Sequence, residues 1–178
     1  DHSVEAGRRS MVLLENNEVN GSPLLPMKEA PGRIAVIGPM ADNRIDIMGS
    51  WHAAGDPDMV VTVSEGLRKQ FPDADIRTAE GCDFYTDDKS GFAEALALAA
   101  FSDVVILAIG ENYVQSGEAA SRSELGLPGV QQELTEAIMS TGKPVVAVIF
   151  AGRPLTINWI SAHVPAVLWA WQPGSRGG

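Results

Sequence analysis

The centre of the sequence carries the stretch Asp103-Val104-Val105-Ile106-Leu107-Ala108-Ile109-Gly110, in which six apolar, mostly β-branched residues follow one another without interruption. A short continuous apolar run of this kind is typical of a strand buried on both faces of a parallel sheet. Comparable runs lie at 33–38, 145–150 and 166–171, and a weaker, alternating run at 75–79 is expected nearer an edge. The sequence therefore predicts a mostly parallel sheet.

Helical patterns separate these strands, and start and stop signals delimit them. We predict helices over 62–71, 92–101 and 128–140, which begin respectively at the Thr62–Glu65 capping-box pattern, at Ser90 and at Pro128. Near-helical spacing of apolar residues predicts a further helix over 4–14. Strands that alternate with helices are joined by right-handed crossovers. The predicted fold class is α/β: a three-layer α/β/α sandwich with a mostly parallel, five- to six-stranded sheet and helices on both faces.

Composition limits the classes of partner. The chain has 178 residues, and its 13 basic and 23 acidic side chains give a formal net charge of −10. This length suits one domain, 1–178, with a substantial core. An excess of acidic residues argues against nucleic acid as a partner, because phosphate binding requires basic side chains. No apolar run approaches the ~18–20 residues of a membrane span, so we expect no membrane partner.

Common metal, nucleotide and nucleophile signatures are absent from the sequence. Cys82 is the single cysteine, which excludes an internal disulfide and a multi-cysteine zinc site. Pro39 and Met40 stand where a dinucleotide-binding turn needs glycines, and neither a phosphate-binding Gly-Lys-Ser/Thr nor a Gly-x-Ser-x-Gly elbow occurs. We expect no metal and no cofactor, and structural or surface roles for His2 and His163.

The two ends suggest a piece of a longer polypeptide. The chain starts inside the helical pattern at 4–14 and stops in the glycine-rich stretch 173–178, directly after a strand that is expected to be buried. We therefore expect a segment of a longer protein, with any localisation signal outside it.

Functional candidates lie after the strands. In open α/β sheets, ligands bind outside the carboxyl ends of the strands, so the loops after Gly38, Gly110 and Phe150 should share one edge. The loop 110–128 is longer than a compact domain needs and is rich in polar side chains. Within it, Glu118 stands among small residues, a setting that suits general acid/base chemistry. A solvated loop with an incidental ion pair is the alternative.

Three other side chains are candidates near this edge. Trp51 lies in a glycine-flanked loop beside His52 and either stacks on a flat ligand face, such as a sugar ring, or folds back over the core. Arg122, four residues after Glu118, is placed to hold that carboxylate or to orient a neighbour. For Arg153, fixed by the following proline, we favour an internal ion pair.

Several segments then match one pattern in order along essentially the whole chain. They are Val12-Leu13-Leu14-Glu15-Asn16, Leu24-Leu25-Pro26, Ile34-Ala35-Val36-Ile37-Gly38-Pro39-x-Ala41-Asp42, Gly49-Ser50-Trp51, Ser116-Gly117-Glu118-Ala119-Ala120-Ser121-Arg122, Leu127-Pro128-Gly129-x-Gln131, Thr141-Gly142-Lys143-Pro144, Gly152-Arg153-Pro154-Leu155 and Pro173-Gly174-Ser175-x-Gly177-Gly178. This pattern resembles the second, α/β-sandwich domain of glycoside hydrolase family 3, most of all bacterial periplasmic β-glucosidases.

The resemblance implies a retaining β-glucosidase whose active site is split between domains. An aspartate nucleophile would come from a preceding barrel domain of the same polypeptide, and Glu118 falls on the family's general acid/base. The resemblance also implies that Trp51, Glu111 and Arg122 bind the β-glucoside or oligosaccharide substrate. It further implies a periplasmic or secreted protein and an inactive isolated fragment.

Two alternatives remain at this point. The first is a non-catalytic carbohydrate-binding or structural module that keeps the fold without using Glu118. The second is a family relative that acts on N-acetylglucosaminides, although such relatives often carry a histidine acid in the barrel. The Ser-Gly-Glu sequence at 116–118 favours the glucosidase over both.

Overall fold

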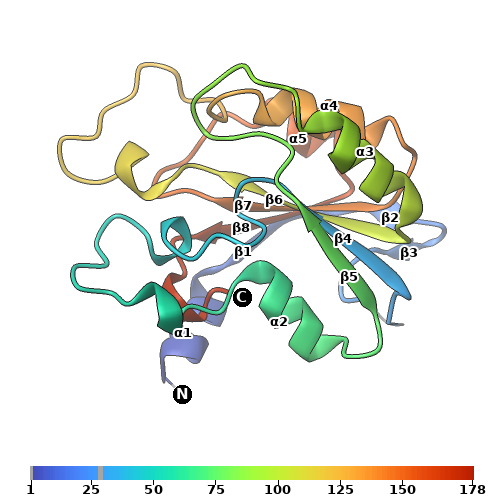
Figure 1. Cartoon of the computed structure of the whole chain (residues 1–178), viewed down its shortest axis with the longest axis horizontal. Coiled ribbons are helices and arrows are strands. Elements are labelled where there is room, and N and C mark those ends of the chain that lie inside the picture. Colours follow the sequence, from blue (N-terminus) through green and yellow to red (C-terminus); the bar gives the residue numbers. More distant parts are fainter. Residues whose placement is uncertain (1, 28–29) are drawn as a thin grey trace.

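The computed structural model describes residues 2–27 and 30–178, which form one six-stranded sheet with helices on both sides (Figure 1). The strand order is β1-β8-β7-β6-β4-β5. The strands are β1 (Val12–Asn16), β4 (Arg33–Ile37), β5 (Asp75–Ala79), β6 (Val104–Gly110), β7 (Val145–Phe150) and β8 (Ala166–Trp171). All neighbours pair in parallel except β1, which runs antiparallel to β8. The weak strand, β5, forms one edge, as the sequence predicted.

The strand β6 lies in the middle of the sheet and is buried along its whole length. Its residues alternate between two cores, because successive side chains of a strand point to opposite faces. Leu107 and its neighbours at 105 and 109 belong to one hydrophobic cluster, whereas Ile106 with 104 and 108 belongs to the other. Burial on both faces explains why this segment is a continuous apolar run.

Helices cover both faces of the sheet, so the predicted three-layer sandwich is confirmed. One face carries α3 (Phe92–Phe101), α4 (Gln131–Met139) and α5 (Asn158–His163), and the other carries α1 (His2–Ser10) and α2 (Val63–Gln70) (Figure 1). None of the helices in the described part of the chain is long and apolar enough to cross a membrane.

The beginning of α2 follows the predicted capping box. The backbone N–H of Glu65 donates to the Thr62 hydroxyl over 3.3 Å, and the Thr62 N–H donates to the Glu65 carboxylate over 3.0 Å. Two N–H groups that the helix itself leaves without partners are therefore satisfied.

The predicted helix over 4–14 was wrong in its second half. The helix α1 ends at Ser10, and Val12–Asn16 forms β1. A short apolar run fits either a helix or a strand by spacing alone. The exposed edge of β8 decides the matter, since β1 pairs along it in an antiparallel register from Val12–Trp169 to Asn16–Ala166.

Two other helix starts differ from the prediction. The Ser90 hydroxyl donates to Asp88 over 2.8 Å and caps no helix; α3 has Gly91 at its N-cap without a side-chain hydrogen bond. The helix predicted from Pro128 begins only at Gln131, because Gly129 has φ +59°, which lies outside the right-handed helical region.

Two further features surround the sheet. His163 is the last residue of α5, and its ring stacks on Trp159 with centroids 4.3 Å apart. A small hairpin of β2 (Glu18–Val19) and β3 (Ser22–Pro23) lies between β1 and β4 along the chain. Trp169 is buried in the core, and Trp159 and Trp171 are half-buried against it.

The chain leaves the sheet at two glycines that no other residue could replace. Gly38 has φ +119°, and a Cβ there would lie 2.1 Å from the Ala108 carbonyl oxygen. Gly110 has φ +144°, and its Cβ would lie 1.8 Å from the carbonyl oxygen of Phe150. Both the backbone angle and the missing space exclude a side chain. The loops that follow β4, β6 and β7 therefore diverge from one edge of the sheet, as predicted.

The central position of β6 gives a test of the core. Leu107 is fully buried, so we expect Leu107→Ala to lower the free energy of unfolding by about 3–4 kcal/mol through lost contacts and a cavity. The matched change Leu125→Ala, at a side chain that is 44% exposed, should alter it by no more than about 0.5 kcal/mol. Urea unfolding of both variants checks the difference; similar values for the two would contradict this placement.

Candidate active site

Glu118 stands at the tip of a tight turn in the loop that follows β6. The Ala120 N–H donates to the Gly117 carbonyl over 3.3 Å, and Glu118 is exposed between them. Gly117 has φ +101° and Ala119 has φ +59°. A residue with a side chain rarely adopts the left-handed conformation of Ala119, so surrounding contacts must hold this turn in place.

The turn lies against the loop that carries Trp51. A Cβ on Gly117 would be 2.9 Å from the Cβ of Ser50 and 3.7 Å from Cε2 of Trp51. The Trp51 side chain is 70% exposed, so it is not folded back over the core. An exposed carboxylate and an exposed indole therefore share one edge of the sheet.

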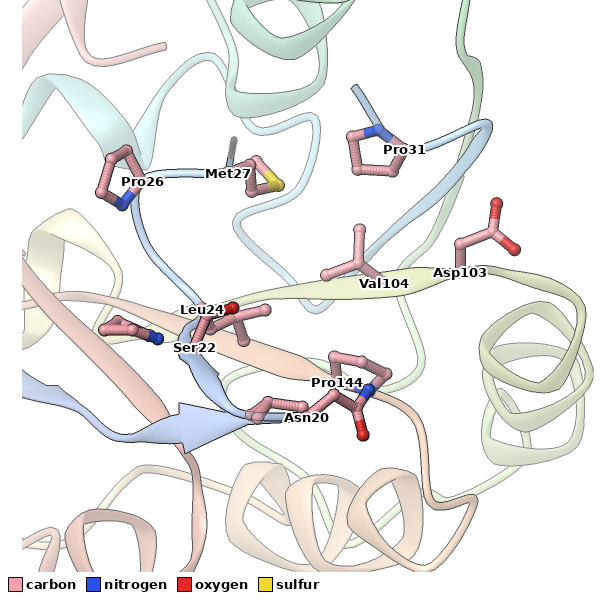
Figure 2. A pocket seen from close by; sticks show the side chains of 11 residues that line it. Asn20, Ser22, Leu24, Pro26, Met27, Pro31, Asp103, Val104 and Pro144 are labelled. Atoms are coloured by element: carbon pink, nitrogen blue, oxygen red, sulfur yellow. The ribbon is translucent and has the colours of Figure 1, made fainter. Parts of the chain in front are cut away.

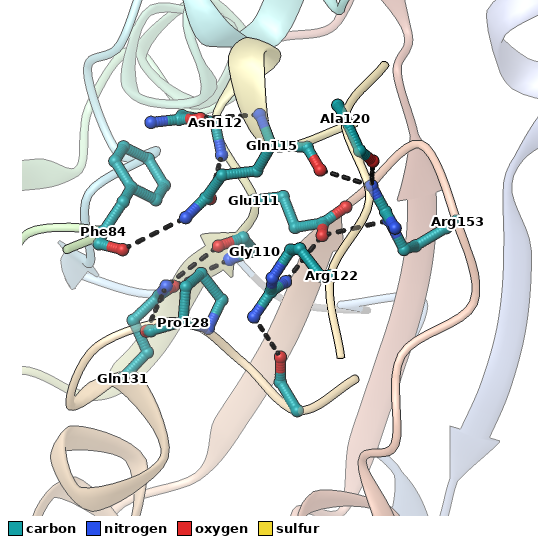
Figure 3. Close-up of polar contacts among 11 residues, drawn as sticks. Phe84, Gly110, Glu111, Asn112, Gln115, Ala120, Arg122, Pro128, Gln131 and Arg153 are labelled. Atoms are coloured by element: carbon teal, nitrogen blue, oxygen red, sulfur yellow. Dashed lines mark hydrogen bonds and ion pairs between the residues drawn. The ribbon is translucent and has the colours of Figure 1, made fainter. Parts of the chain in front are cut away.

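Glu111 and Arg122, predicted to bind substrate, form an interior ion pair instead of facing the solvent (Figure 3). The Glu111 side chain is 1% exposed, and Nη1 of Arg122 donates to its Oε1 over 2.6 Å. Nε of Arg153 lies 3.2 Å from the same oxygen, which confirms the predicted internal ion pair of Arg153. Among the described residues, Glu111 Oε2 has no hydrogen-bond partner. Arg122 therefore orients a neighbouring carboxylate rather than holding Glu118.

The two arginines also hold the backbone of the loop. Nη2 of Arg153 donates to the carbonyl oxygens of Gln115 and Ala120, the latter over 2.7 Å (Figure 3). Nη2 of Arg122 donates to the Gly126 carbonyl over 3.1 Å. Three carbonyl groups spread over twelve residues of the loop are thus tied to a single buried carboxylate.

Gln131 clamps the two ends of the loop and was not recognised as a functional candidate from the sequence. Its fully buried side chain accepts from the Gly110 N–H over 2.8 Å, and it donates to the carbonyls of Gly110 and Pro128 over 2.8 and 2.9 Å (Figure 3). The one signal in the sequence was its place in the Leu-Pro-Gly-x-Gln segment at 127–131.

Further contacts fix the start of the loop. The Ser50 hydroxyl donates to the Tyr113 carbonyl over 2.8 Å and accepts from the Gln172 side chain over 3.0 Å. The Tyr113 N–H donates to Asp46 over 2.9 Å, and the Tyr113 ring meets His52 edge-on with centroids 5.2 Å apart. The loops after β4, β6 and β8 therefore meet around Glu118.

Cys82 is not a candidate nucleophile. Its thiol is buried, and burial raises its pKa to about 12, with the carboxylates of Asp83 and Glu80 adding to the shift. The nearby acidic loop is occupied with its own backbone: the N–H groups of Thr86 and Tyr85 donate to Asp83 and hold the pKa of that carboxyl below its usual range. No group of histidine, cysteine and acidic side chains able to hold a metal ion occurs among residues 2–27 and 30–178.

A cavity of about 380 Å³ lies at the opposite edge of the sheet, at the amino ends of the strands (Figure 2). Prolines and apolar residues line much of it, including Pro26, Pro31 and Pro144. Among the described residues that line it, Asp103 is the one carboxylate, and its hydrogen bond from Arg33 holds the pKa of that carboxyl below its usual range. This described lining offers no acid/base pair, so the candidate site remains the edge with Glu118.

Comparison with known proteins identifies the family. Residues 11–178 match the family described as Glycosyl hydrolase family 3 C-terminal domain. The chain belongs to glycosyl hydrolase family 3. The resemblance inferred from the ordered segments is thereby confirmed, as is the α/β-sandwich fold.

Relatives within family 3 include enzymes named for two sugars. The chain is 38% identical to a β-xylosidase of Formosa agariphila over 184 residues, covering 100% of this chain and 25% of the relative. It is 36% identical to the periplasmic β-glucosidase of Salmonella typhimurium, covering 98% of this chain and 25% of the relative. The chain thus spans about a quarter of the length of these curated relatives.

Solved structures of family 3 enzymes share this fold. A Listeria innocua β-glucosidase in complex with gluconolactone superposes with a TM-score of 0.86 at 34% identity, over 99% of this chain and 23% of that one. An exo-β-xylosidase with a xylobiose aziridine probe gives a TM-score of 0.87 at 29% identity, over 98% of this chain and 22% of that one. The family-level chemistry of the relatives is glycoside hydrolysis.

The buried ion pair makes a stability prediction. Removing one partner of a buried pair costs about 3–5 kcal/mol, and because the two arginines stay 17% and 21% exposed, we expect Glu111→Gln to cost about 3 kcal/mol. The control Asp75→Asn breaks an exposed pair with Arg77 and should cost less than about 1 kcal/mol. Urea unfolding measures the free energy of unfolding of both variants. An unchanged free energy of unfolding in Glu111→Gln would contradict the interior placement of Glu111.

Cys82 gives a second check. With the pKa of its thiol near 12, almost no thiolate exists at pH 8, and burial blocks access to the sulfur. We expect no alkylation by iodoacetamide in the folded protein and complete alkylation in urea. Rapid alkylation of the folded protein at pH 8 would show that this region is open.

Proposed function

We propose that this chain is the acid/base-bearing domain of a longer retaining glycosidase that removes terminal β-linked glucosyl residues. Glu118 is the general acid/base, and an aspartate nucleophile comes from a barrel domain of the same polypeptide. The observation that carries the proposal is the placement of Glu118: exposed at the tip of a turn, at the carboxyl edge of the sheet, on a loop tied down on several sides.

The mechanism explains why the carboxylate projects from the domain. A retaining glycosidase needs its two carboxyl groups about 5–5.5 Å apart, one to attack the anomeric carbon and one to protonate the leaving oxygen. A carboxylate that stands out from its own domain can reach a nucleophile on another. In a retaining glycosidase the same carboxyl group first gives its proton to the leaving oxygen and then, as a carboxylate, activates the water that hydrolyses the glycosyl-enzyme.

Two consequences follow for the isolated domain. Without the nucleophile, it should turn over no substrate. Trp51, which lies beside the Glu118 turn with an open face, is placed to contact the sugar or its aglycone. Glu111 and Arg122 support the loop from the interior through their ion pair.

The choice of sugar and compartment rests on the relatives. The periplasmic β-glucosidase of Salmonella typhimurium supports glucosides as substrates and a periplasmic or secreted location. The β-xylosidase of Formosa agariphila makes xylosides the second candidate. Parallel assays with aryl β-glucosides and aryl β-xylosides decide between them.

The test uses the full-length enzyme that contains this domain. We expect Glu118→Ala to lower turnover of aryl glycosides that need acid assistance by about 10²–10⁴-fold, since general acid–base catalysis contributes that much. With a 2,4-dinitrophenyl glycoside, whose leaving group needs no acid, azide should restore turnover and give a glycosyl azide of retained anomeric configuration, because the small anion replaces the activated water in the attack on the glycosyl-enzyme.

The control is Glu124→Ala, which removes another exposed carboxylate from the same loop and should leave turnover unchanged. Unchanged turnover in Glu118→Ala would place the acid elsewhere. Turnover of neither glycoside by the wild-type enzyme would favour a binding module of the same fold.

A further inference from the structure

We propose that Arg153, anchored by the buried Glu111, is a positioning residue that sets where the carboxyl group of Glu118 stands. The inference rests on the proposed acid/base role of Glu118 and adds the residues that hold it. Arg153 touches neither Glu118 nor any group outside the domain in the contacts described above. It acts through the backbone of the turn.

The geometry points to Arg153 because its guanidinium spans the turn. Nη2 donates to the Gln115 carbonyl, three residues before Glu118, and to the Ala120 carbonyl, two residues after it (Figure 3). Both ends of the projecting segment are therefore bound to one nitrogen atom. Any displacement of that nitrogen moves the two ends of the turn together.

The guanidinium itself is fixed from the interior. Nε of Arg153 forms an ion pair with Glu111 Oε1 over 3.2 Å without hydrogen-bond geometry, and the same oxygen accepts a hydrogen bond from Arg122. Glu111 directly follows β6, and its own N–H donates to the Phe150 carbonyl at the end of β7 over 2.8 Å. The turn that carries Glu118 is thus connected to the central strands β6 and β7 through Arg153 and Glu111.

Lysine could not make this set of contacts. Arginine presents donors in a rigid planar fork, so one side chain reaches a carboxylate through Nε and two carbonyls through Nη2. An ammonium group is a single point charge on a flexible stem. It can replace the ion pair with Glu111 or the contacts to the turn, but it cannot hold both in one orientation.

A turn that contains a strained residue needs such an anchor. Ala119 is in the left-handed conformation, which favours glycine, so the turn tends to relax when its ends are released. A general acid works only within hydrogen-bond reach of the leaving oxygen. Misplacement of a catalytic group by about 1 Å costs about 10²-fold in rate.

The distinguishing readout is the dependence of kcat/KM on the leaving group. Phenolate is a poor leaving group, so cleavage of the phenyl glycoside needs a proton from the general acid. 2,4-Dinitrophenolate is a good leaving group and departs without that proton. A misplaced acid therefore lowers kcat/KM for the phenyl glycoside and spares the dinitrophenyl glycoside. A smaller folded fraction or a damaged pocket lowers both equally.

The experiment compares Arg153→Met with wild type in the full-length enzyme, using phenyl and 2,4-dinitrophenyl glycosides of the preferred sugar. We expect kcat/KM for the phenyl glycoside to fall by about 10²-fold and that for the dinitrophenyl glycoside by a few-fold at most. Arg153→Lys, which keeps a cation beside Glu111, should also lower kcat/KM more for the phenyl glycoside than for the dinitrophenyl glycoside, but by a smaller factor. It also serves as the test if Arg153→Met fails to fold.

Arg33→Met is the matched control, because it removes an arginine–aspartate pair at the opposite edge of the sheet and should change neither constant. Equal losses for the two glycosides in both Arg153 variants, or no loss in Arg153→Lys, would overturn the positioning role. Glu118→Ala is measured beside these variants. If it lowers kcat/KM equally for the phenyl and dinitrophenyl glycosides, the proposed acid/base role of Glu118 fails. If it lowers kcat/KM selectively for the phenyl glycoside and the Arg153 variants do not, only the positioning role of Arg153 fails.

Discussion

The carboxylate of Glu111, buried at the end of the central strand, is the interaction on which the candidate site depends. It forms ion pairs with both Arg122 and Arg153, and these arginines bind backbone carbonyls of the loop around Glu118. A buried charge keeps its place because leaving a partner uncompensated is costly. The exposed carboxylate is therefore held by an interior one, although the two never touch in the contacts described.

The sheet supplies the fixed reference for this arrangement. Because β6 is buried on both faces, its carboxyl end cannot shift without disturbing two cores. Gly110, at the end of β6, lies so close to the Phe150 carbonyl that no side chain fits there, and the loop leaves the sheet directly after it. Gln131 then holds the end of the loop, at Pro128, beside its start at Gly110, so the residues between them project from the edge of the sheet.

Patterns in the sequence predicted the elements with continuous signals and failed where a local signal had two solutions. The capping box at Thr62 was correct, since Glu65 is fixed by its spacing on the helix. Leu13 and its neighbours fitted a helix as well as a strand, and only the free edge of β8 made them β1. Pro128 carried a helix-start signal, but the left-handed conformation of Gly129 delays the helix to Gln131.

The sequence by itself determined the parallel sheet, the edge that carries the candidate site and, through its ordered segments, the family. Those properties follow from hydrophobic periodicity and from residue identity, which are local. Only the tertiary structure decided that Glu111 and Arg122 lie inside and Trp51 outside, and that Arg153 spans the turn of Glu118. The ion pair of Arg153 with Glu111 joins residues 42 positions apart, so no local pattern specifies it.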